Sequence, residues 1–438
     1  MILQRNSANP LVRDVLARPS ATDPTTLATA IEQCCADILK ELSGAIKIVA
    51  TEHPGAAHGH RFYPDISGWA SSHNPYAWSE YIDPAAGVMR LVLGAGSRLS
   101  AVNEYPRIVA LSAPDRRPEA YFEDICSHSQ RRADFINTKT GATETDYVAD
   151  LIQARSLRVI ELLTSTGDMY HPVTGEPIRA LTCEGLLHDT PLVHFMRELL
   201  HRLAGAADNS VEITFVLQLN DGLGAMDLTP ITLRAIEHPI PFDPATGKVL
   251  FSSQGYTLGR SRFTRFDRLV HISPRQYSLL SLTNRFELAR LMGRIRRTLG
   301  DAPWILAGPG RWGTSSPELG VPVRFAEISS VGTLVEIAEM HEALTPEVSL
   351  GTHFMNDIIS HDILCAAVLP ERKDHFVDSA FFEQAPNSLA RFMPGAEAWK
   401  DVLHVLEAHD CGGESFIVWA DAVQRRMICA IEMEINSR

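Results

Sequence analysis

Three prolines lie within six residues, at positions 239, 241 and 244, and interrupt the chain near its middle. Proline fixes φ and removes a backbone N–H donor, so neither a helix nor a central strand continues through such a cluster. The chain has 438 residues, which is also too long for a single ordinary hydrophobic core. We therefore predict two domains, residues 1–238 and residues 239–438, divided at this segment.

Apolar strand patterns and amphipathic helix patterns occur on both sides of the prolines, which indicates an α/β or α+β fold class. In the first domain we expect two buried strands, one amphipathic helix and a β-hairpin, over residues 89–97, 105–114, 190–203 and 211–233. A further helix is expected over residues 25–42. In the second domain we expect strands at 268–272 and 303–308 and helices at 284–300 and 331–344.

Charge and cysteine content exclude several classes of protein. The formal net charge is -13, which argues against a broad nucleic-acid-binding surface, because phosphate contacts need clustered Lys and Arg. No apolar run reaches the roughly 18–20 residues that span a bilayer. The first residues contain no apolar signal core, and the seven cysteines form no CxxC pair. These features predict a cytoplasmic protein without a nucleic-acid or membrane partner.

Four segments occur in an order that resembles the phosphoenolpyruvate synthase and pyruvate phosphate dikinase family. They are FYPDISGWASSHNPYAWSEYIDPAAGVMRLVLGAGSR, YPRIVALSAPDRRPE, GPGRWGTSSPELGVPVRFAEIS and VSLGTHFMND. The similarity extends from about Ile46 to the end of the chain. It implies a kinase-type phosphotransferase lineage with ATP and Mg²⁺ as cofactors. The first domain would then be a partial ATP-grasp-like domain with a trimmed N-terminal lobe, followed by a second mixed α/β domain.

Two segments of the first domain are similar to the phosphate-binding elements of that family. Arg18 in ARPSATD matches an arginine of the N-terminal lobe, although the acidic pair and phosphate loop that normally follow are missing. A family glycine turn is matched by Gly94, Gly96 and Arg98. Glycines let a backbone approach a ligand closely, and arginine can bind phosphate through two N–H groups. The resemblance therefore predicts nucleotide contacts at these four residues; the alternative for the glycine turn is a strand-ending turn beside a surface arginine.

The hairpin over residues 211–233 is where the chain departs most from the family pattern. The family holds Mg²⁺ with a glutamate and a glutamine on the two strands, because hard cations take oxygen ligands. In this chain the glutamate position is Thr214, the glutamine position is Pro230, and a following arginine position is Thr232. Glu212, two residues before Thr214 and on the same face of the strand, is the candidate substitute metal ligand.

The second domain contains the glycine motif GPGRWG at residues 308–313, after an apolar strand. A dinucleotide-binding loop would require a helix to open at its last glycine. The following TSSPELGVPV predicts a loop instead, so we reject that interpretation. Two others remain: a rigid loop that presents Arg311 and Trp312 to an anionic ligand, or a structural turn with Trp312 in the core. His353 in GTHF is a second catalytic candidate, because the family's chemistry passes phosphate through a histidine; a packed histidine is the alternative.

We therefore expect a divergent phosphotransferase-family protein that binds a nucleotide or a phosphorylated metabolite. Its Mg-ATP site would be eroded, or a separately encoded partner protein would supply the missing lobe. The alternative is a non-catalytic regulatory or interaction subunit that retains the fold. A third hypothesis is an enzyme with repurposed chemistry in a pocket of the second domain, where Arg311 and His353 are the catalytic candidates.

Overall fold

The structure, a computed structural model, describes residues 2–5, 13–14, 46–49, 54–96, 104–119, 121–153, 155–219, 226–236, 241–243, 247–341, 344–349 and 354–433. The chain forms two compact units. The first consists of Met1–Ser72, Gly87–Asp115 and Ala120–Ala235, and the second of His73–Ala86, Arg116–Glu119 and Ile236–Arg438. Segments 73–86 and 116–119, which the predicted division placed in the first domain, thus belong to the second unit. No helix in the described residues is both long and apolar enough to cross a membrane.

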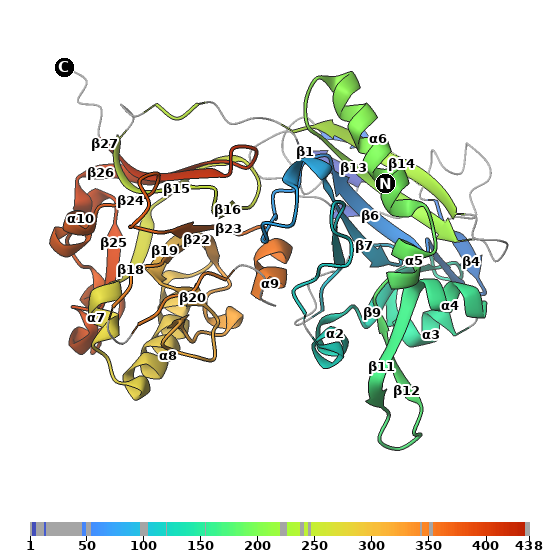
Figure 1. The fold of residues 1–438 in the computed structure, drawn as a ribbon, viewed down its shortest axis with the longest axis horizontal. Helices are drawn as coiled ribbons and strands as arrows, with labels where there is room; N and C mark the ends of the chain where they lie inside the picture. Colours follow the sequence, from blue (N-terminus) through green and yellow to red (C-terminus); the bar gives the residue numbers. More distant parts are fainter. Residues whose placement is uncertain are drawn as a thin grey trace. The chain divides into compact units, whose positions relative to one another are not determined.

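An antiparallel sheet with strand order β14-β13-β6-β7-β8 forms the centre of the first unit (Figure 1). Its strands are β6 (Ile66–Ser71), β7 (Val88–Leu93), β8 (Arg107–Ala110), β13 (Val211–Leu219) and β14 (Met226–Ala235). Side chains alternate between the two faces of a strand, so one face collects the apolar residues. Ile66, Met89 and Ile213 on that face pack in one core with Leu192 and Met196 of helix α6 (Leu192–Ala207).

Smaller elements complete the first unit. The strands β11 and β12 form a two-stranded ribbon that projects from the rest of this unit (Figure 1). The remaining strands are β1 (Ile2–Arg5), β2 (Arg13–Asp14), β3 (Ile46–Val49), β4 (Ala56–His58), β5 (Arg61–Tyr63), β9 (Arg132–Asn137), β10 (Thr143–Tyr147), β11 (Thr164–Tyr170) and β12 (Pro177–Leu181). The short helices are α2 (Phe122–His128), α3 (Val148–Ile152), α4 (Leu157–Leu163) and α5 (Glu184–His188).

The second unit is built around a six-stranded sheet with the order β16-β23-β22-β19-β18-β25. Its four central strands are parallel and its two edge strands are antiparallel to their neighbours. The strands are β16 (Thr257–Leu258), β18 (Arg268–Ile272), β19 (Trp304–Pro309), β22 (Val331–Ile337), β23 (Leu364–Val368) and β25 (Leu403–Glu407). Parallel strands are usually buried on both faces, and β19 and β23 are buried along their whole length.

Two apolar cores lie on the two faces of this sheet. On one face, Leu306 and Leu334 pack with Met292 of the long helix α8. On the other face, Val335 packs with Val418 of a second, five-stranded sheet whose order is β17-β26-β27-β15-β24. The unit therefore has three layers, with helices, a mainly parallel sheet and an antiparallel sheet.

The other elements of the second unit are short, apart from α8 and three strands. The strands are β15 (Gly247–Gln254), β17 (Arg262–Phe266), β20 (Arg311–Trp312), β21 (Gly320–Val321), β24 (Phe376–Val377), β26 (Gly413–Asp421) and β27 (Arg426–Met433). The helices are α7 (Pro274–Ser278), α8 (Leu282–Leu299), α9 (Phe354–Ser360), α10 (Ser379–Gln384) and α11 (Leu389–Phe392), with 3-10 turns η1 (Pro84–Ala86), η3 (Phe325–Glu327), η4 (Glu397–Trp399) and η5 (His409–Cys411).

Several elements that the sequence patterns predict are present in the structure, and one prediction was wrong. The mixed α/β class, the hairpin, the helix that ends at Gly300 and the strand before GPGRWG are all confirmed. In the run 331–344, which is expected to be a helix, residues 331–337 instead form strand β22, and the described residues 338–341 are not helical. The run contains Val331, Thr333, Val335 and Ile337, whose β-branched side chains favour a buried strand. The helix expected over residues 25–42 lies outside the described residues.

Candidate functional site

The β13–β14 hairpin carries neutral side chains at the predicted metal positions. Thr214 Oγ1 lies 2.7 Å from Thr232 Oγ1 on the facing strand, so the two hydroxyl groups are hydrogen bonded to each other. Pro230 pairs with Phe215 next to a register shift and is exposed. Mg²⁺ sites usually include at least one carboxylate. The hydroxyl pair therefore joins Thr214, at the predicted glutamate position, to Thr232, at the predicted arginine position, while the predicted glutamine position is Pro230.

Glu212 lies on the same strand as Thr214. The strand alternates in burial, with Glu212 and Thr214 half-buried and their neighbours Val211 and Ile213 in the core. Glu212 therefore shares a face with Thr214, opposite the core, and its Cα partners are Ser71 on β6 and Arg234 on β14. Its role as a substitute metal ligand stays a prediction.

The glycine turn after β7 has a structural explanation. Gly94 and Gly96 have φ values of 86° and 73°, in the left-handed region. A Cβ atom on Gly94 would lie 2.6 Å from the carbonyl oxygen of Asp134, and Ser67 Oγ donates a hydrogen bond of 2.6 Å to the Gly94 carbonyl. The glycines are thus required by a packed turn, whether or not a ligand binds nearby. Arg98, Arg18 and His353 lie outside the described residues.

The parallel sheet of the second unit brings several loops to one edge. Strands β18, β19, β22 and β23 run in the same direction, so the loops that follow them leave from their shared carboxyl edge. Ligands of open α/β sheets bind at this edge. The loop after β19 is GPGRWG, and its short strand β20 pairs with β21 in parallel. A ligand site in the second unit is therefore expected at this edge.

A buried carboxyl group near the end of β22 connects two of these loops. Glu336 is 1% exposed. It accepts hydrogen bonds from the Ser349 backbone N–H at 2.7 Å, from the Ser349 hydroxyl, and from the Trp312 backbone N–H at 3.4 Å. Burial raises the pKa of Glu336 to about 7, against the opposing effects of these donors and of Arg311. The carboxyl group thus bonds the backbone of Trp312 in GPGRWG and that of Ser349, and its pKa lies near neutral pH.

Sequence reasoning does not identify Glu336, because the pattern of its segment predicts a helix. One signal could have found it. Glu336 is the single charged residue in VGTLVEI, a run otherwise composed of apolar residues, glycine and threonine. A lone carboxylate inside a buried strand must accept hydrogen bonds, because burying an isolated ionised group in an apolar interior costs a large free energy.

Arg311 and Trp312, which are adjacent in the motif, have different environments. Trp312 is 1% exposed and belongs to the core between the sheet and α8, so the structural-turn interpretation is correct for it. The Arg311 side chain is 24% exposed, and its Nη1 lies 3.2 Å from Glu347 Oε2. Its Nε is buried and has no hydrogen-bond partner among the described residues. Because the Glu347 side chain is 56% exposed, this ion pair is largely open to solvent and is weak.

Two buried side chains hold the continuation of the loop in place. The Tyr277 hydroxyl donates to the Gly320 carbonyl at 2.7 Å. Arg285, which is 2% exposed, donates from Nη1 to the Pro317 carbonyl at 3.0 Å and from Nη2 to the Ser278 carbonyl at 2.9 Å. The loop is therefore anchored from helices α7 and α8 as well as from Glu336. Such anchoring fixes the backbone from which Arg311 projects.

Glycines allow this loop to close tightly, which gives a testable prediction. Gly310 has φ 58°, and a Cβ atom there would lie 2.2 Å from the Leu319 carbonyl oxygen. We expect Gly310→Ala to lower the free energy of unfolding by about 2–3 kcal/mol, because the backbone must shift. Gly205→Ala in α6, where nothing lies within 4 Å, is the matched control and is expected to stabilise by roughly 0.5–1 kcal/mol. Urea denaturation measures both; equal effects would show that the loop relaxes freely.

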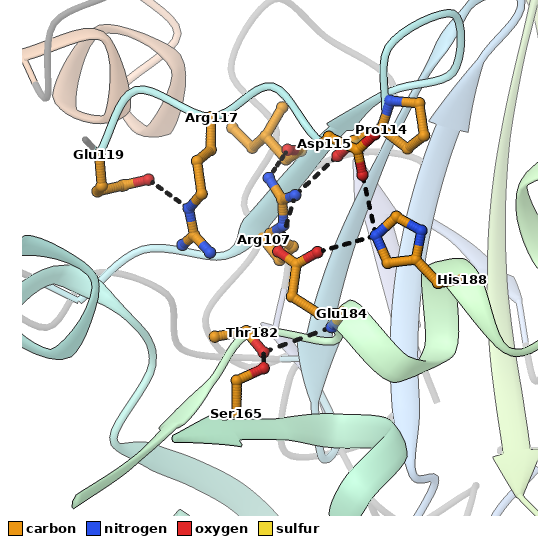
Figure 2. A network of polar contacts seen from close by, with 10 residues as sticks. Arg107, Pro114, Asp115, Arg117, Glu119, Ser165, Thr182, Glu184 and His188 are labelled. Atoms are coloured by element: carbon orange, nitrogen blue, oxygen red, sulfur yellow. Dashed lines mark hydrogen bonds and ion pairs between the residues drawn. The ribbon is translucent and has the colours of Figure 1, made fainter. Parts of the chain in front are cut away.

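Three of the four segments that resemble the dikinase family pack around helix α9 in the second unit. Asn356 on α9 donates a hydrogen bond of 2.6 Å to Glu119 Oε1, and Arg117 Nε donates to Glu119 Oε2 at 3.0 Å (Figure 2 draws the second contact). Burial opposes ionisation of Glu119, but Arg117 and Asn356 hold its pKa below the usual value. A Cβ atom on Gly313 would lie 2.7 Å from the Phe354 ring of the same helix. The RRPE, GPGRWG and FMND segments are therefore parts of one packed region.

A separate polar network lies in the first unit (Figure 2). His188 Nε2 lies 2.9 Å from Asp115 Oδ1 and 3.3 Å from Glu184 Oε2. Glu184 Oε1 lies 3.3 Å from Arg107 Nη2, which also donates to the Pro114 carbonyl at 2.8 Å. One histidine and two carboxylates could hold a divalent cation, but their close contacts are already explained by the ion pairs. Asp115 is 74% exposed, as is typical of a surface network.

Two cavities in the described part of the second unit lie away from GPGRWG. One of about 560 Å³ is lined by Phe242, Trp419 and Arg426 among others. The other, of about 390 Å³, is lined by Asn387, Lys400 and His404 among others. Neither is lined by Arg311 or Glu336. Comparison with protein-family models and with curated proteins gave no match to this chain.

Proposed function

We propose that this chain is a divergent relative of the phosphoenolpyruvate synthase and pyruvate phosphate dikinase family that binds a nucleotide or a phosphorylated metabolite. Its anion contact is Arg311, at the carboxyl edge of the parallel sheet in the second unit. The proposal rests on the four ordered motif segments and on the packing of three of them around α9 and GPGRWG. The mixed α/β class is compatible with it.

The environment of Arg311 is the observation that carries the proposal. Its guanidinium group is partly buried on an anchored loop, and its ion-pair partner Glu347 is exposed. A phosphate group can replace Glu347, because it offers more negative charge and several acceptor oxygens to the same N–H donors. The Nε donor, which has no partner among the described residues, would gain one.

The hairpin of the first unit favours binding without Mg-ATP chemistry. Thr214 and Thr232 offer neutral hydroxyl groups that are bonded to each other, and no carboxylate stands at the predicted glutamate position. A regulatory or interaction subunit that binds the ligand without transferring phosphate is therefore the second candidate function. It differs from the first in one measurable way, since its ligand affinity would not depend on Mg²⁺.

Arg311→Ala tests the proposal. We expect wild-type protein to be stabilised against heat by ATP, phosphoenolpyruvate or inorganic phosphate, by mass action. The substitution should weaken binding by roughly 10- to 100-fold, because it removes a charge-assisted contact worth about 1.5–3 kcal/mol. The matched control is Arg290→Ala, an exposed arginine on α8 that makes the same change in net charge.

Three outcomes separate the hypotheses. Loss of the thermal shift in Arg311→Ala, with Arg290→Ala unchanged, supports the site. Equal binding by both variants places the ligand elsewhere. No shift of the wild-type protein with any of the three ligands, with or without Mg²⁺, would falsify the proposed function.

A further inference from the structure

The hydrogen bonds around Glu336 allow two protonation states. When the carboxyl group is ionised, the Ser349 hydroxyl donates to it, as do the backbone N–H groups of Ser349 and Trp312. When it is protonated, the same hydroxyl can rotate and accept the new O–H, since a serine hydroxyl is both donor and acceptor. Neither state leaves the site without hydrogen bonds, so a proton can enter or leave with little change in packing.

The charged groups around Glu336 come from a few elements. Strand β20 contributes Arg311, whose positive charge favours the ionised form of Glu336. Strand β23 contributes Cys365, whose thiol stays neutral because burial raises its pKa well above the usual value. Strand β19 contains no ionisable side chain. The segment that contains Ser349 contributes Glu347, which is paired with Arg311, and the chain after β22 contributes Glu339 and His341, 3.5 Å apart.

We propose that anion binding at Arg311 is coupled to proton uptake by Glu336. The inference rests on the proposed function, because it requires an anion at Arg311. A dianion in place of the Glu347 carboxylate adds negative charge to a guanidinium that now offsets Glu336. Repulsion from this added charge then favours the neutral form of the buried Glu336 carboxyl group, and the proton comes from the solvent.

Coupling of this kind is reciprocal, so protonation of Glu336 must strengthen anion binding. Because the carboxyl group titrates close to neutral pH, the effect falls in the physiological range. Glu336 thereby acts as a positioning residue that holds Trp312 and Ser349, and as the group that sets the affinity of the site at a given pH.

Inorganic sulfate is the probe for this inference, because it remains a dianion where phosphate esters themselves titrate. Calorimetric titration of the full chain at about pH 6 and about pH 8 should give roughly three- to tenfold weaker binding at the higher pH. Repeating the titration in two buffers with different heats of ionisation measures the protons taken up by the wild-type protein. Glu336→Gln should bind with the same affinity at both values of pH and take up no proton.

The outcomes distinguish this inference from the proposed function. Sulfate binding that is lost in Arg311→Ala but shows no pH dependence and no proton uptake overturns the inference alone. Unchanged pH dependence in Glu336→Gln also overturns it, because another group would then carry the proton. No sulfate binding at either pH overturns the inference, and failure of all phosphorylated ligands as well overturns the proposed function. Since proton uptake is measured on the wild-type protein, the test does not depend on folding of the variant.

Discussion

Replacing Trp312 by alanine is expected to lower the free energy of unfolding by about 3–5 kcal/mol, as for other large aromatic residues in cores. The side chain is 1% exposed, and its ring packs so closely on Gly308 that a Cβ atom there would lie 2.8 Å from it. The substitution leaves a cavity that the anchored loop cannot fill. Urea denaturation followed by circular dichroism measures the loss.

The neighbouring residue provides the control for this experiment. Arg311→Ala is expected to change the free energy of unfolding by less than about 1 kcal/mol, because its ion pair with Glu347 is largely solvated. Adjacent residues of one motif would thus separate stability from ligand binding. If Trp312→Ala instead kept normal stability and lost only anion binding, the ring would have to be a ligand contact.

The second large effect concerns the pH dependence of stability. Burial raises the pKa of Glu336 from 4.5 to about 7, so between these values the folded protein holds a proton that the unfolded chain has released. The stabilisation is therefore complete below about pH 4.5 and is lost as pH rises through about 7. A shift of this size corresponds to about 3 kcal/mol of unfolding free energy.

Glu336→Gln should remove this component, because an amide does not titrate in the range. The plot of unfolding free energy against pH is then flatter than that of the wild-type protein between about pH 5 and about pH 7.5. Glu371→Gln, at an exposed position after β23, is the control and should leave the wild-type profile unchanged. Identical slopes for Glu336→Gln and the wild-type protein would mean that Glu336 is already ionised at low pH.

Local patterns in the sequence predict those helices and strands in which the hydrophobic periodicity ends at a glycine, a proline or another turn-forming residue. The helix predicted over residues 284–300 ends at a glycine with φ 77°, and the first hairpin strand, β13, alternates between buried and half-buried residues from Val211 to Thr214, as its sequence indicates. The glycines of GPGRWG indicated a loop after a strand, and β19 ends at Pro309. Such features depend on neighbours in the chain, which is why one sequence suffices to find them.

The candidate site could not be predicted in the same way, because its residues are distant in the sequence. Glu336 lies in a strand that was read as a helix, and its partners Trp312 and Ser349 come from two different loops. The sequence is also compatible with either a ligand contact or a structural turn at Arg311 and Trp312. Only the burial of each side chain in the structure distinguishes these interpretations. Arg98, Arg18 and His353 remain predictions outside the described residues.

The membership of segment 73–86 in the second unit has a consequence for synthesis on the ribosome. Pro75 accepts a hydrogen bond of 2.9 Å from the Gly259 backbone N–H, and Trp78 packs against the core of that unit. These residues leave the ribosome long before the strands that will receive them. The early segment must therefore stay accessible, with its aromatic side chains uncovered, while the rest of the chain is made. A gene split at the proline-rich segment would encode a second half that lacks part of its own core.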